Sequence, residues 1–443
     1  MTNKFYPVIG LEIHIELETD SKMFCSCPAN HFDKEPNSQT CPVCLGLPGA
    51  LPVPNKEAIK RTILLSLALD CQISKTTWFD RKNYFYPDLP KGYQISQFFK
   101  PLGKNGQITL QSNKVVKIRE IHLEEDTAKS IHRKINGKEV TLLDFNKSGV
   151  PLIEVVSEPD LTSAQEAKEY AQAIHQLVRH IKISHADMEK GQMRLEANIS
   201  LKKRPNDPLP SYRIEIKNIN SFKFLKDSIN YEISRQQKLL NQGKQISQET
   251  RGYDSKNKKT FVQRSKEEAY EYRYFPEPDI PPFIIDKLFP IEELRKSIPE
   301  LPEQTVNRLM SQYHLSSYQA KIIAKNHKTL SYFEKAAKVG QKQKMKANNI
   351  ANVIINKKFF INKLSPQQLI NKIEAEKGQV LISGKELKEI ITGVLQNNPQ
   401  AVGDYKKGKT TAITFLIGQV QKETKGKANI PETQKILKEK LSS

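Results

Sequence analysis

The sequence predicts an α+β protein in which an antiparallel sheet forms a cradle and helices build the C-terminal part. Three observations lead to this class. Several segments alternate between apolar and polar residues, which is typical of strands with one covered and one open face. Amphipathic helical segments separate these strands. From about residue 299 the chain becomes rich in Lys, Gln and Asn, with helical periodicity and few strand signals.

The first predicted strand, residues 8–17, shows the alternation most clearly. Its apolar residues occupy every second position, and Glu12, His14 and Glu16 share the opposite face, because side chains along a strand alternate with period two. Two or more carboxylates and a neutral imidazole in a row suit a divalent cation. A solvent-exposed strand with hydrated charges is the alternative interpretation.

Composition limits the class of protein. The chain has 443 residues and carries 70 Lys and Arg against 49 Asp and Glu, a net charge of +21. The length suits two or three domains, and the charge favours a polyanionic partner. No apolar run reaches the roughly 18 residues of a membrane span, and the N-terminal residues lack the apolar core of a signal peptide. We therefore expect a soluble, cytoplasmic protein with no membrane partner.

Four of the five cysteines form two close pairs. Cys25 and Cys27 are separated by thirteen residues from Cys41 and Cys44. Two such pairs joined by a loop are typical of a structural zinc site with four thiolate ligands. Unligated thiols are the alternative. Cys71 stands alone, and we expect it in the core.

Residues 79–98 interleave aromatic rings with cations. Arg81, Lys82 and Lys91 stand among tyrosines and phenylalanines that include Tyr84. Such a mixture can stack on nucleobases and contact phosphates. Packing of the tyrosines within a loop explains the composition equally well.

Four further segments are predicted strands, at residues 115–125, 149–156, 193–200 and 212–217. The first of them ends in Glu124 and Glu125 and is followed by Asp126, and three adjacent acids repel one another unless a cation or water separates them. Glu154 interrupts an otherwise apolar strand, and a carboxylate in that setting needs a partner. Together the strands suggest one sheet whose open face is a polar cradle.

Predicted helices fill the intervals. One covers residues 56–69, another follows a capping box formed by Ser163 and Glu166, and a third spans residues 225–240. The C-terminal residues 331–443 hold 21 lysines against nine acidic residues, a net charge of +12. A helical module that contacts a nucleic-acid backbone is one use for such a surface, and a merely solvated lysine-rich face is the other.

Residues 403–410 match the Walker A pattern letter for letter. That motif binds phosphates only where a buried strand leads into the loop and a helix follows. The preceding Asn-Asn-Pro-Gln is not a buried strand, and no alternation of strands and helices surrounds it. We therefore expect no nucleotide at this loop.

Six segments taken together resemble one family closely. They are residues 8–14, 79–88, 121–126, 152–160, 215–222 and 404–409. They resemble the B subunits of the aspartyl/glutamyl-tRNA(Asn/Gln) amidotransferases, the GatB family, almost from end to end. The resemblance implies a catalytic cradle over residues 1–292 with a glutamine-synthetase-like core and a zinc loop near residues 25–44. It also implies a helical domain over residues 293–362 and a YqeY-like, tRNA-binding tail over residues 363–443.

The resemblance further implies an ATP-dependent ligase that acts as a heterotrimer with a glutamine amidase partner, the A subunit, and a small partner, the C subunit. The implied reaction converts misacylated Glu-tRNA(Gln) or Asp-tRNA(Asn) to the amide. ATP phosphorylates the side-chain carboxylate, and ammonia from the amidase then displaces phosphate. This chain would be the kinase and transamidase component, with Mg²⁺ as the cation that phosphoryl transfer needs.

By the same resemblance, His14, Glu125 and Glu154 are expected to bind Mg²⁺, with Glu12 and Glu124 beside them as supporting groups or an ammonia relay. These five residues form the predicted catalytic set.

Substrate contacts are predicted for Arg81, Lys82, Tyr84, Lys91, Glu196, Lys217 and Arg273. At one of these positions the sequence departs from the family: where most members have Arg-Cys-Asp-Ala-Asn, this chain has Arg-Leu-Glu-Ala-Asn at residues 194–198. Glu196 keeps the charge but is longer by one methylene, which leaves its role open. Some members of the family also lack the cysteines, so the zinc is not required for catalysis throughout the family.

Two other functions are compatible with the sequence. A non-catalytic component could use the zinc loop and the basic tail to position tRNA. A lone ATP-dependent amide ligase is the other alternative, but the sequence contains no Gly-Gly pair for a serine-amidase loop, which favours a partner protein as the source of ammonia.

Overall fold

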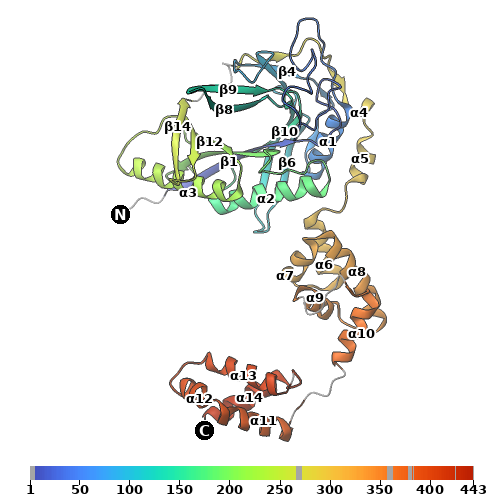
Figure 1. The fold of residues 1–443 in the computed structure, drawn as a ribbon, viewed down its shortest axis with the longest axis vertical. Helices are drawn as coiled ribbons and strands as arrows, with labels where there is room; N and C mark the ends of the chain where they lie inside the picture. The colour runs from blue at the N-terminus through green and yellow to red at the C-terminus, as the bar shows by residue number, and fades with distance from the viewer. Residues whose placement is uncertain are drawn as a thin grey trace. The chain divides into compact units, whose positions relative to one another are not determined.

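The structure is a computed structural model that describes residues 5–265, 272–356, 363–377, 382, 384–424 and 426–442 (Figure 1). The chain divides into two compact units, Met1–Glu303 and Gln304–Ser443. The first unit combines a large sheet with helices, and the second is helical in its described residues. The α+β class predicted from the sequence is confirmed.

The strands of the first unit have the following bounds: β1 Tyr6–Glu16, β2 Gln72–Ile73, β3 Thr76–Thr77, β4 Asp80–Asn83, β5 Tyr93–Ser96, β6 Gly103–Thr109, β7 Val115–Glu125, β8 Lys129–Ile135, β9 Lys138–Asp144, β10 Pro151–Ser157, β11 Met193–Lys202, β12 Ile214–Ile219, β13 Glu249–Asp254, β14 Lys259–Ser265, β15 Phe275–Pro276 and β16 Phe283–Ile284. Its helices are α1 Lys56–Ala68, α2 Ala164–His180, α3 Phe222–Asn241, α4 Ile285–Leu288 and α5 Ile291–Ser297.

The main sheet has the strand order β14-β13-β12-β11-β1-β10-β7-β6-β2 in the described part of the chain. Every neighbouring pair is antiparallel except β12 and β13, which are parallel. The first strand of the chain therefore lies at the centre, between β11 and β10. Its position makes β1 the element that the strands on both sides depend on.

One face of this sheet is covered by helices, and the other faces the β8–β9 hairpin (Figure 1). The apolar residues of β1 lie on the covered face, where Ile9, Leu11, Ile13 and Ile15 are at most 1% exposed. They belong to one core with the apolar sides of α1, α2 and α3. Burial of each such side chain stabilises the fold by roughly 1.5–3 kcal/mol. The alternation thus decides which face of β1 is covered.

The start of α2 differs in one detail from the predicted capping box. The Ser163 hydroxyl accepts a hydrogen bond from the backbone N–H of Glu166, as predicted. The Glu166 carboxylate, however, accepts from the N–H of Thr162 and not from that of Ser163. Glu166 therefore accepts from the N–H one residue before the one that the capping-box pattern predicts.

A smaller sheet of β15, β4 and β5 joins segments that are far apart in the sequence. Phe275 pairs with Arg81 in this sheet. The Arg81 guanidinium donates two hydrogen bonds to the Glu277 carboxylate, at 2.7 and 2.8 Å, and the Glu277 side chain is fully buried. Such a bidentate pair fixes the later segment against β4.

The second unit contains α6 Pro302–Tyr313, α7 Ser317–Ala324, α8 His327–Lys342, α9 Ala347–Ile355, α10 Pro366–Lys377, α11 Gly384–Asn397, α12 Pro399–Lys406, α13 Ala412–Glu423 and α14 Ile430–Ser442. Its buried apolar residues form two clusters, one from Leu309 to Ile373 and one from Leu387 to Leu441. The predicted boundary after residue 362 lies at the edge of the undescribed residues 357–362. The predicted domain boundaries stay predictions.

Two expectations about short stretches of sequence can be compared with the structure. Gly403 of the Walker-like stretch lies inside α12, so no strand leads into that loop. Among the described residues, none of the helices has the length and apolar character of a membrane span.

A partly buried ionic network connects β1 and β11 with the residue that follows β7. The Asp126 carboxylate contacts the Lys147 ammonium at 2.5 Å and the Arg194 guanidinium at 2.9 Å. Lys147 also lies 3.4 Å from Glu16, which contacts His31 at 3.2 Å. Burial alone would raise the pKa of Asp126, but Arg194 and Lys147 outweigh it and hold the pKa well below its ordinary value of 3.8.

We predict that Asp126→Asn destabilises the first unit by about 1–3 kcal/mol at pH 7, because the buried side chain loses its charge-assisted hydrogen bonds to Lys147 and Arg194. A depressed pKa stabilises the fold above the ordinary value and loses that contribution as the pH falls through the folded-state pKa. The deficit of the variant should therefore shrink as the pH falls below about 4.

The measurement is urea unfolding at several pH values. Trp78, the only tryptophan of the chain, lies in the first unit, so its fluorescence reports that unit. Asp20→Asn, at an exposed position, is the control. An Asp126→Asn deficit that stays constant with pH would contradict the prediction.

Candidate functional site

A row of potential metal ligands crosses the open face of the main sheet. Five adjacent strands, β12, β11, β1, β10 and β7, each contribute to it. The side chains form two groups: His14, Glu124 and Glu154, and Glu12, Glu196 and Glu215. The two groups meet on β1, where Glu12 and His14 are two residues apart and so share a face.

The first group combines an imidazole with two carboxylates. His14 pairs with Glu154 across β1 and β10, and Glu124 comes from β7 on the other side of β10. The His14 Nε2 lies 3.9 Å from an oxygen of each carboxylate, and one ligand atom of each residue lies within 4.8 Å of the others. This donor set fits a hard divalent cation such as Mg²⁺, which takes one or two carboxylates and completes its shell with water.

One predicted ligand is not in this group. Glu125 follows Glu124 in β7, so its side chain points to the other face, which it shares with Leu123. There its carboxylate pairs with the Lys91 ammonium and accepts a hydrogen bond from the N–H of Ile95 at 3.0 Å. Glu124 therefore stands where the sequence analysis placed Glu125. Because His122 and Glu124 are polar and Leu123 between them is apolar, the alternation in the sequence assigns Glu124 to the polar face of β7 and Glu125 to the face of Leu123.

The second group consists of three carboxylates. Glu12 pairs with Glu196 across β1 and β11, and Glu215 comes from β12. The Asn198 amide donates to Glu12 at 2.8 Å. Glu215 was not predicted as a site residue, although its strand alternates in the same way as the others. Its place opposite Asn198 becomes visible only when β11 and β12 are paired.

Lys217 follows Glu215 by two residues in β12, so it shares the face of Glu215 and lies beside this second group. The register between β11 and β12 shifts near Ala197, and Asn218 has a left-handed φ of 58°. Bulges of this kind occur next to active sites. The Lys217 ammonium lies 3.3 Å from Glu196 and 3.4 Å from Glu215.

The protonation of these acids reflects their crowding. Burial raises the pKa of Glu12, Glu124 and Glu196, and nearby carboxylates raise each further. Burial also acts to raise the pKa of Glu154, but His14, together with His122 and Lys82, outweighs it and lowers the pKa. Added positive charge between the carboxylates favours their ionised forms.

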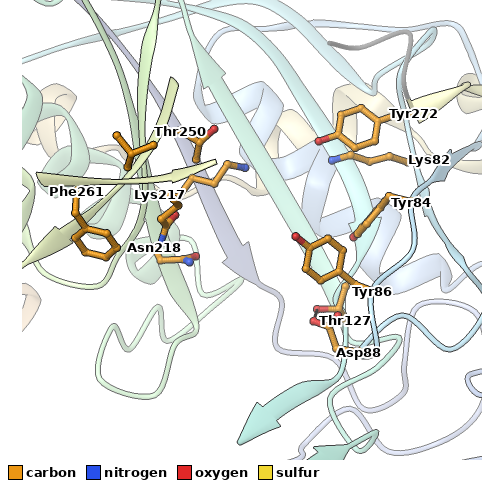
Figure 2. Close-up of a pocket in the computed structure, with 12 residues that line it drawn as sticks. Lys82, Tyr84, Tyr86, Asp88, Thr127, Lys217, Asn218, Thr250, Phe261 and Tyr272 are labelled. Carbon is orange, nitrogen blue, oxygen red and sulfur yellow. Dashed lines mark hydrogen bonds between the residues drawn. The ribbon is translucent and has the colours of Figure 1, made fainter. Parts of the chain in front are cut away.

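A cavity of about 730 Å³ opens beside this row. Figure 2 shows Lys82 and Lys217 on opposite walls, with their ammonium groups directed towards each other across the space. The Lys82 wall carries the rings of Tyr84, Tyr86 and Tyr272. Burial would lower the pKa of Lys82, but Tyr274 and the acids of the first group outweigh it, so its pKa lies well above the ordinary value.

The predicted substrate contacts divide into two sets. Lys82, Tyr84 and Lys217 line the cavity, and Glu196 belongs to the second acidic group. Three others do not line it: Arg81 pairs with Glu277, Lys91 pairs with Glu125 and Arg273 is exposed. For Arg81 the reason is its place in β4, which turns the guanidinium towards β15.

The four paired cysteines meet as the spacing predicts. One thiol atom from each of Cys25, Cys27, Cys41 and Cys44 lies within 4.8 Å of the others. A tetrahedral zinc ion with Zn–S bonds of about 2.3 Å separates its sulfurs by about 3.8 Å, so the cluster fits this ion. Hydrogen bonding from the Cys25 thiol lowers the pKa of Cys44 to about 4.

Lys22 places its ammonium group beside this cluster. Its side chain is fully buried, and its ammonium lies 3.6 Å from the Cys44 sulfur and donates to the carbonyl of Gln39 at 2.9 Å. A buried cation offsets the negative charge of a thiolate cluster. Cys71 is buried in the core, as expected.

The cysteine loop also contacts the Lys91–Glu125 pair. Gly46 follows Cys44 by two residues and has a left-handed φ of 69°. A Cβ atom at Gly46 would lie 2.4 Å from the Cγ of Lys91 and 3.1 Å from its Cα. The glycine thus lets the loop backbone pack directly on the stem of Lys91.

Comparisons with known proteins agree on one family. A family model described as the GatB/GatE catalytic domain matches residues 7–289, and one described as the GatB domain matches residues 291–441. The curated B subunits of the aspartyl/glutamyl-tRNA(Asn/Gln) amidotransferases from Thermotoga petrophila, Thermosipho melanesiensis and Persephonella marina are 41%, 42% and 43% identical to this chain. Each alignment covers 99% of this chain and 99–100% of the relative.

We predict that Gly46→Ala destabilises the first unit by about 1–3 kcal/mol more than Gly49→Ala, which is the cost of overpacking. Both glycines have a left-handed φ, 69° and 85°, so both substitutions carry backbone strain, but nothing lies within 4 Å of a Cβ at Gly49. Trp78 fluorescence during urea unfolding measures the difference.

A double-mutant cycle with Lys91→Ala tests the cause. Removal of the Lys91 side chain beyond Cβ removes the closest contact, so Gly46→Ala should cost less in that background. Equal costs for Gly46→Ala with and without Lys91 would show that the loop does not pack on this side chain.

Proposed function

Because the chain belongs to the GatB family of tRNA-dependent amidotransferase subunits, we propose that it is the kinase and transamidase component of such a complex. Its substrates would be Glu-tRNA(Gln), Asp-tRNA(Asn) or both, together with ATP and ammonia. The observation that carries the proposal is the six-residue row of ligands on the open face of the sheet, beside a cavity with two opposed lysines.

The chemistry proposed for the site has two steps. The side-chain carboxylate of the attached amino acid attacks the γ-phosphorus of ATP, which forms an acyl phosphate and releases ADP. Ammonia then attacks the acyl carbon, loses a proton and expels inorganic phosphate, which leaves the amide. Both steps need groups that oppose the negative charge gathered on phosphate oxygens.

Two Mg²⁺ ions would be held here, one by His14, Glu124 and Glu154 and the other by Glu12, Glu196 and Glu215. Held in this way, Mg²⁺ would supply positive charge that offsets the negative charge developing on the phosphate during transfer. Glu196 fits this role in place of an aspartate, since its strand pairing sets it opposite Glu12.

The two lysines have a complementary role. Lys82 and Lys217 remain protonated because the acids beside each of them outweigh the effect of burial and raise the pKa. From opposite walls they would hold the phosphate groups over the row of ligands. A fixed cation costs no reorganisation during the reaction, which is what makes it effective.

The remaining parts suit the same complex. A glutamine amidase partner would supply ammonia, a small third protein would join the assembly, and the lysine-rich second unit would contact tRNA through its backbone. The cysteine cluster would hold a structural zinc ion, since its four thiols leave no open position for chemistry. We place the complex in the cytoplasm, where unpaired thiols such as these persist.

The first prediction concerns the zinc site. The purified chain should contain about one zinc ion. The Cys44→Ser variant should contain none, and the Cys71→Ser variant should contain as much zinc as the wild type. Metal analysis measures the content, and the Trp78 unfolding transition should move to lower urea in the Cys44→Ser variant, because the metal ties the loop to the sheet. Zinc that is lost equally from both variants would argue against the cluster as its site.

The second prediction separates Glu124 from Glu125 in the assembled complex. Glu124→Gln should lower Mg²⁺-dependent ATP hydrolysis with Glu-tRNA(Gln) by about 100-fold or more and raise the Mg²⁺ concentration needed for half of the maximal rate. Glu125→Gln keeps the ligand group intact, so its Mg²⁺ requirement should match that of the wild type.

Controls decide between this function and a component that only binds tRNA. Glutaminase activity and tRNA affinity should be retained in Glu124→Gln. Unchanged ATP hydrolysis in that variant would move the kinase site elsewhere and leave this chain as a tRNA platform.

A further inference from the structure

Six aromatic rings form a continuous series beside the cavity. Neighbouring ring centroids lie 4.1–6.2 Å apart, and one pair, Tyr274 and Phe98, is stacked with an angle of 11° between the ring planes. We call this series the aromatic track; in spatial order its members are Tyr86, Tyr84, Tyr272, Tyr274, Phe98 and Phe99.

The track is held by a fixed framework, although its residues come from three separate segments. The Asn83 side-chain amide donates to the carbonyls of Tyr272 and Arg273, at 3.3 and 2.9 Å. The backbone N–H groups of Phe98 and Phe99 donate to the Asp80 carboxylate, at 2.7 and 3.0 Å. Rings positioned in this way are preorganised for a ligand, which lowers the entropic cost of binding.

Both ends of the track are exposed to solvent. Tyr86 is 51% exposed at one end, and Phe98 and Phe99 are 42% and 46% exposed at the other. Tyr84, Tyr272 and Tyr274 between them are half-buried, and exposed rings that continue into a cavity are candidates for an interaction site.

Positive charge accompanies the rings. The Lys82 ammonium lies 5.9 Å from the centroid of Tyr84 and 5.1 Å from that of Tyr272. At the outer end, the ammonium of Lys100 lies 5.6 Å from the ring of Trp78. Aromatic faces combined with cations are the means by which proteins bind unpaired nucleotides without reading their sequence.

The track also has a direction. Tyr84, Tyr86 and Tyr272 line the cavity, whereas Tyr274, Phe98 and Phe99 do not. A single-stranded nucleic acid that follows the track from Phe99 inward therefore ends beside Lys82 and the first ligand group. This is where a carboxylate would be phosphorylated.

We propose that the aromatic track binds the unpaired 3′ end of the aminoacyl-tRNA. The terminal nucleotide would stack at Tyr84 and Tyr272, and the preceding nucleotides would stack outward on Tyr274, Phe98 and Phe99. This inference rests on the proposed function, because that function requires the esterified amino acid to reach the acids. Duplex RNA does not fit, since its base faces are covered, and ATP has one base for a series of six rings.

The experiment uses the assembled complex and a deacylated tRNA with 2-aminopurine in place of its terminal adenine, in the absence of ATP. Stacking quenches this fluorophore, so binding to the wild type should quench it. Tyr272→Leu should abolish most of the quenching and, like Phe99→Leu, weaken tRNA binding roughly 5- to 100-fold. Since Phe99 is exposed, its variant keeps the test valid should Tyr272→Leu fail to fold.

Two matched variants identify the ring as the cause. Tyr272→Phe keeps the ring and should quench like the wild type. Phe261→Leu removes an exposed ring from the opposite wall of the same cavity and should also quench like the wild type. Loss of quenching in Phe261→Leu, or retained quenching and affinity in both Tyr272→Leu and Phe99→Leu, would overturn the proposal.

A parallel titration with 2-aminopurine riboside triphosphate and Mg²⁺ tests whether the track binds the base of the ATP substrate in place of the tRNA. Its quenching should be insensitive to Phe99→Leu and Tyr272→Leu. If these variants affect the triphosphate and not the tRNA, the track is a site for the nucleotide and the proposal is wrong. Because the tRNA titration contains no ATP and needs no phosphoryl transfer, its outcome is independent of the ATP-hydrolysis assay, and failure of the kinase assignment would be seen separately.

Discussion

Repulsion among the carboxylates on the open face of the sheet is the constraint on which the rest of the site depends. At about 4 Å, two like charges repel by roughly 4 kcal/mol at the effective dielectric of a protein surface. Five glutamates of this face form the two ligand groups, and Lys82 and Lys217 are directed at each other across the adjoining cavity. The raised pKa values of Glu12, Glu124 and Glu196 show that nearby positive charge does not fully offset the burial and mutual repulsion of these carboxylates. A site of this kind gains stability from added cations, which is also what phosphoryl transfer requires.

Packing on the opposite, apolar face of the same strands holds these carboxylates together despite their repulsion. The apolar side of β1 packs on the helices, and the pairs with β10 and β11 set His14 against Glu154 and Glu12 against Glu196. A shift of one residue in either register would turn the acids into the core. The hydrophobic layer thus fixes the positions of ligands that would otherwise separate.

The alternation of β7 lets two adjacent acids take different roles. Glu124 faces the ligand group, while Glu125 faces the cysteine loop through Lys91 and Gly46. The prediction that Glu125 is a metal ligand came from family resemblance and stays a prediction, whereas the phase of the strand sets Glu124 beside His14 and Glu154. Glu215 was overlooked for a related reason, since an acid on one strand gains a partner only when its neighbour in the sheet is known. The same holds for Arg81, whose partner Glu277 is 196 residues away.

The sequence by itself determined the α+β class, the strands that carry the open face, the side of β1 that is buried and the gathering of four cysteines. These features depend on local periodicity and spacing, which are visible within a single segment of the sequence. Only the tertiary structure decided which acids share a group, that Lys217 also reaches Glu196 on the neighbouring strand, and that six rings from distant segments adjoin. Such contacts depend on strand order, register and packing between segments far apart in the chain, which local sequence does not encode.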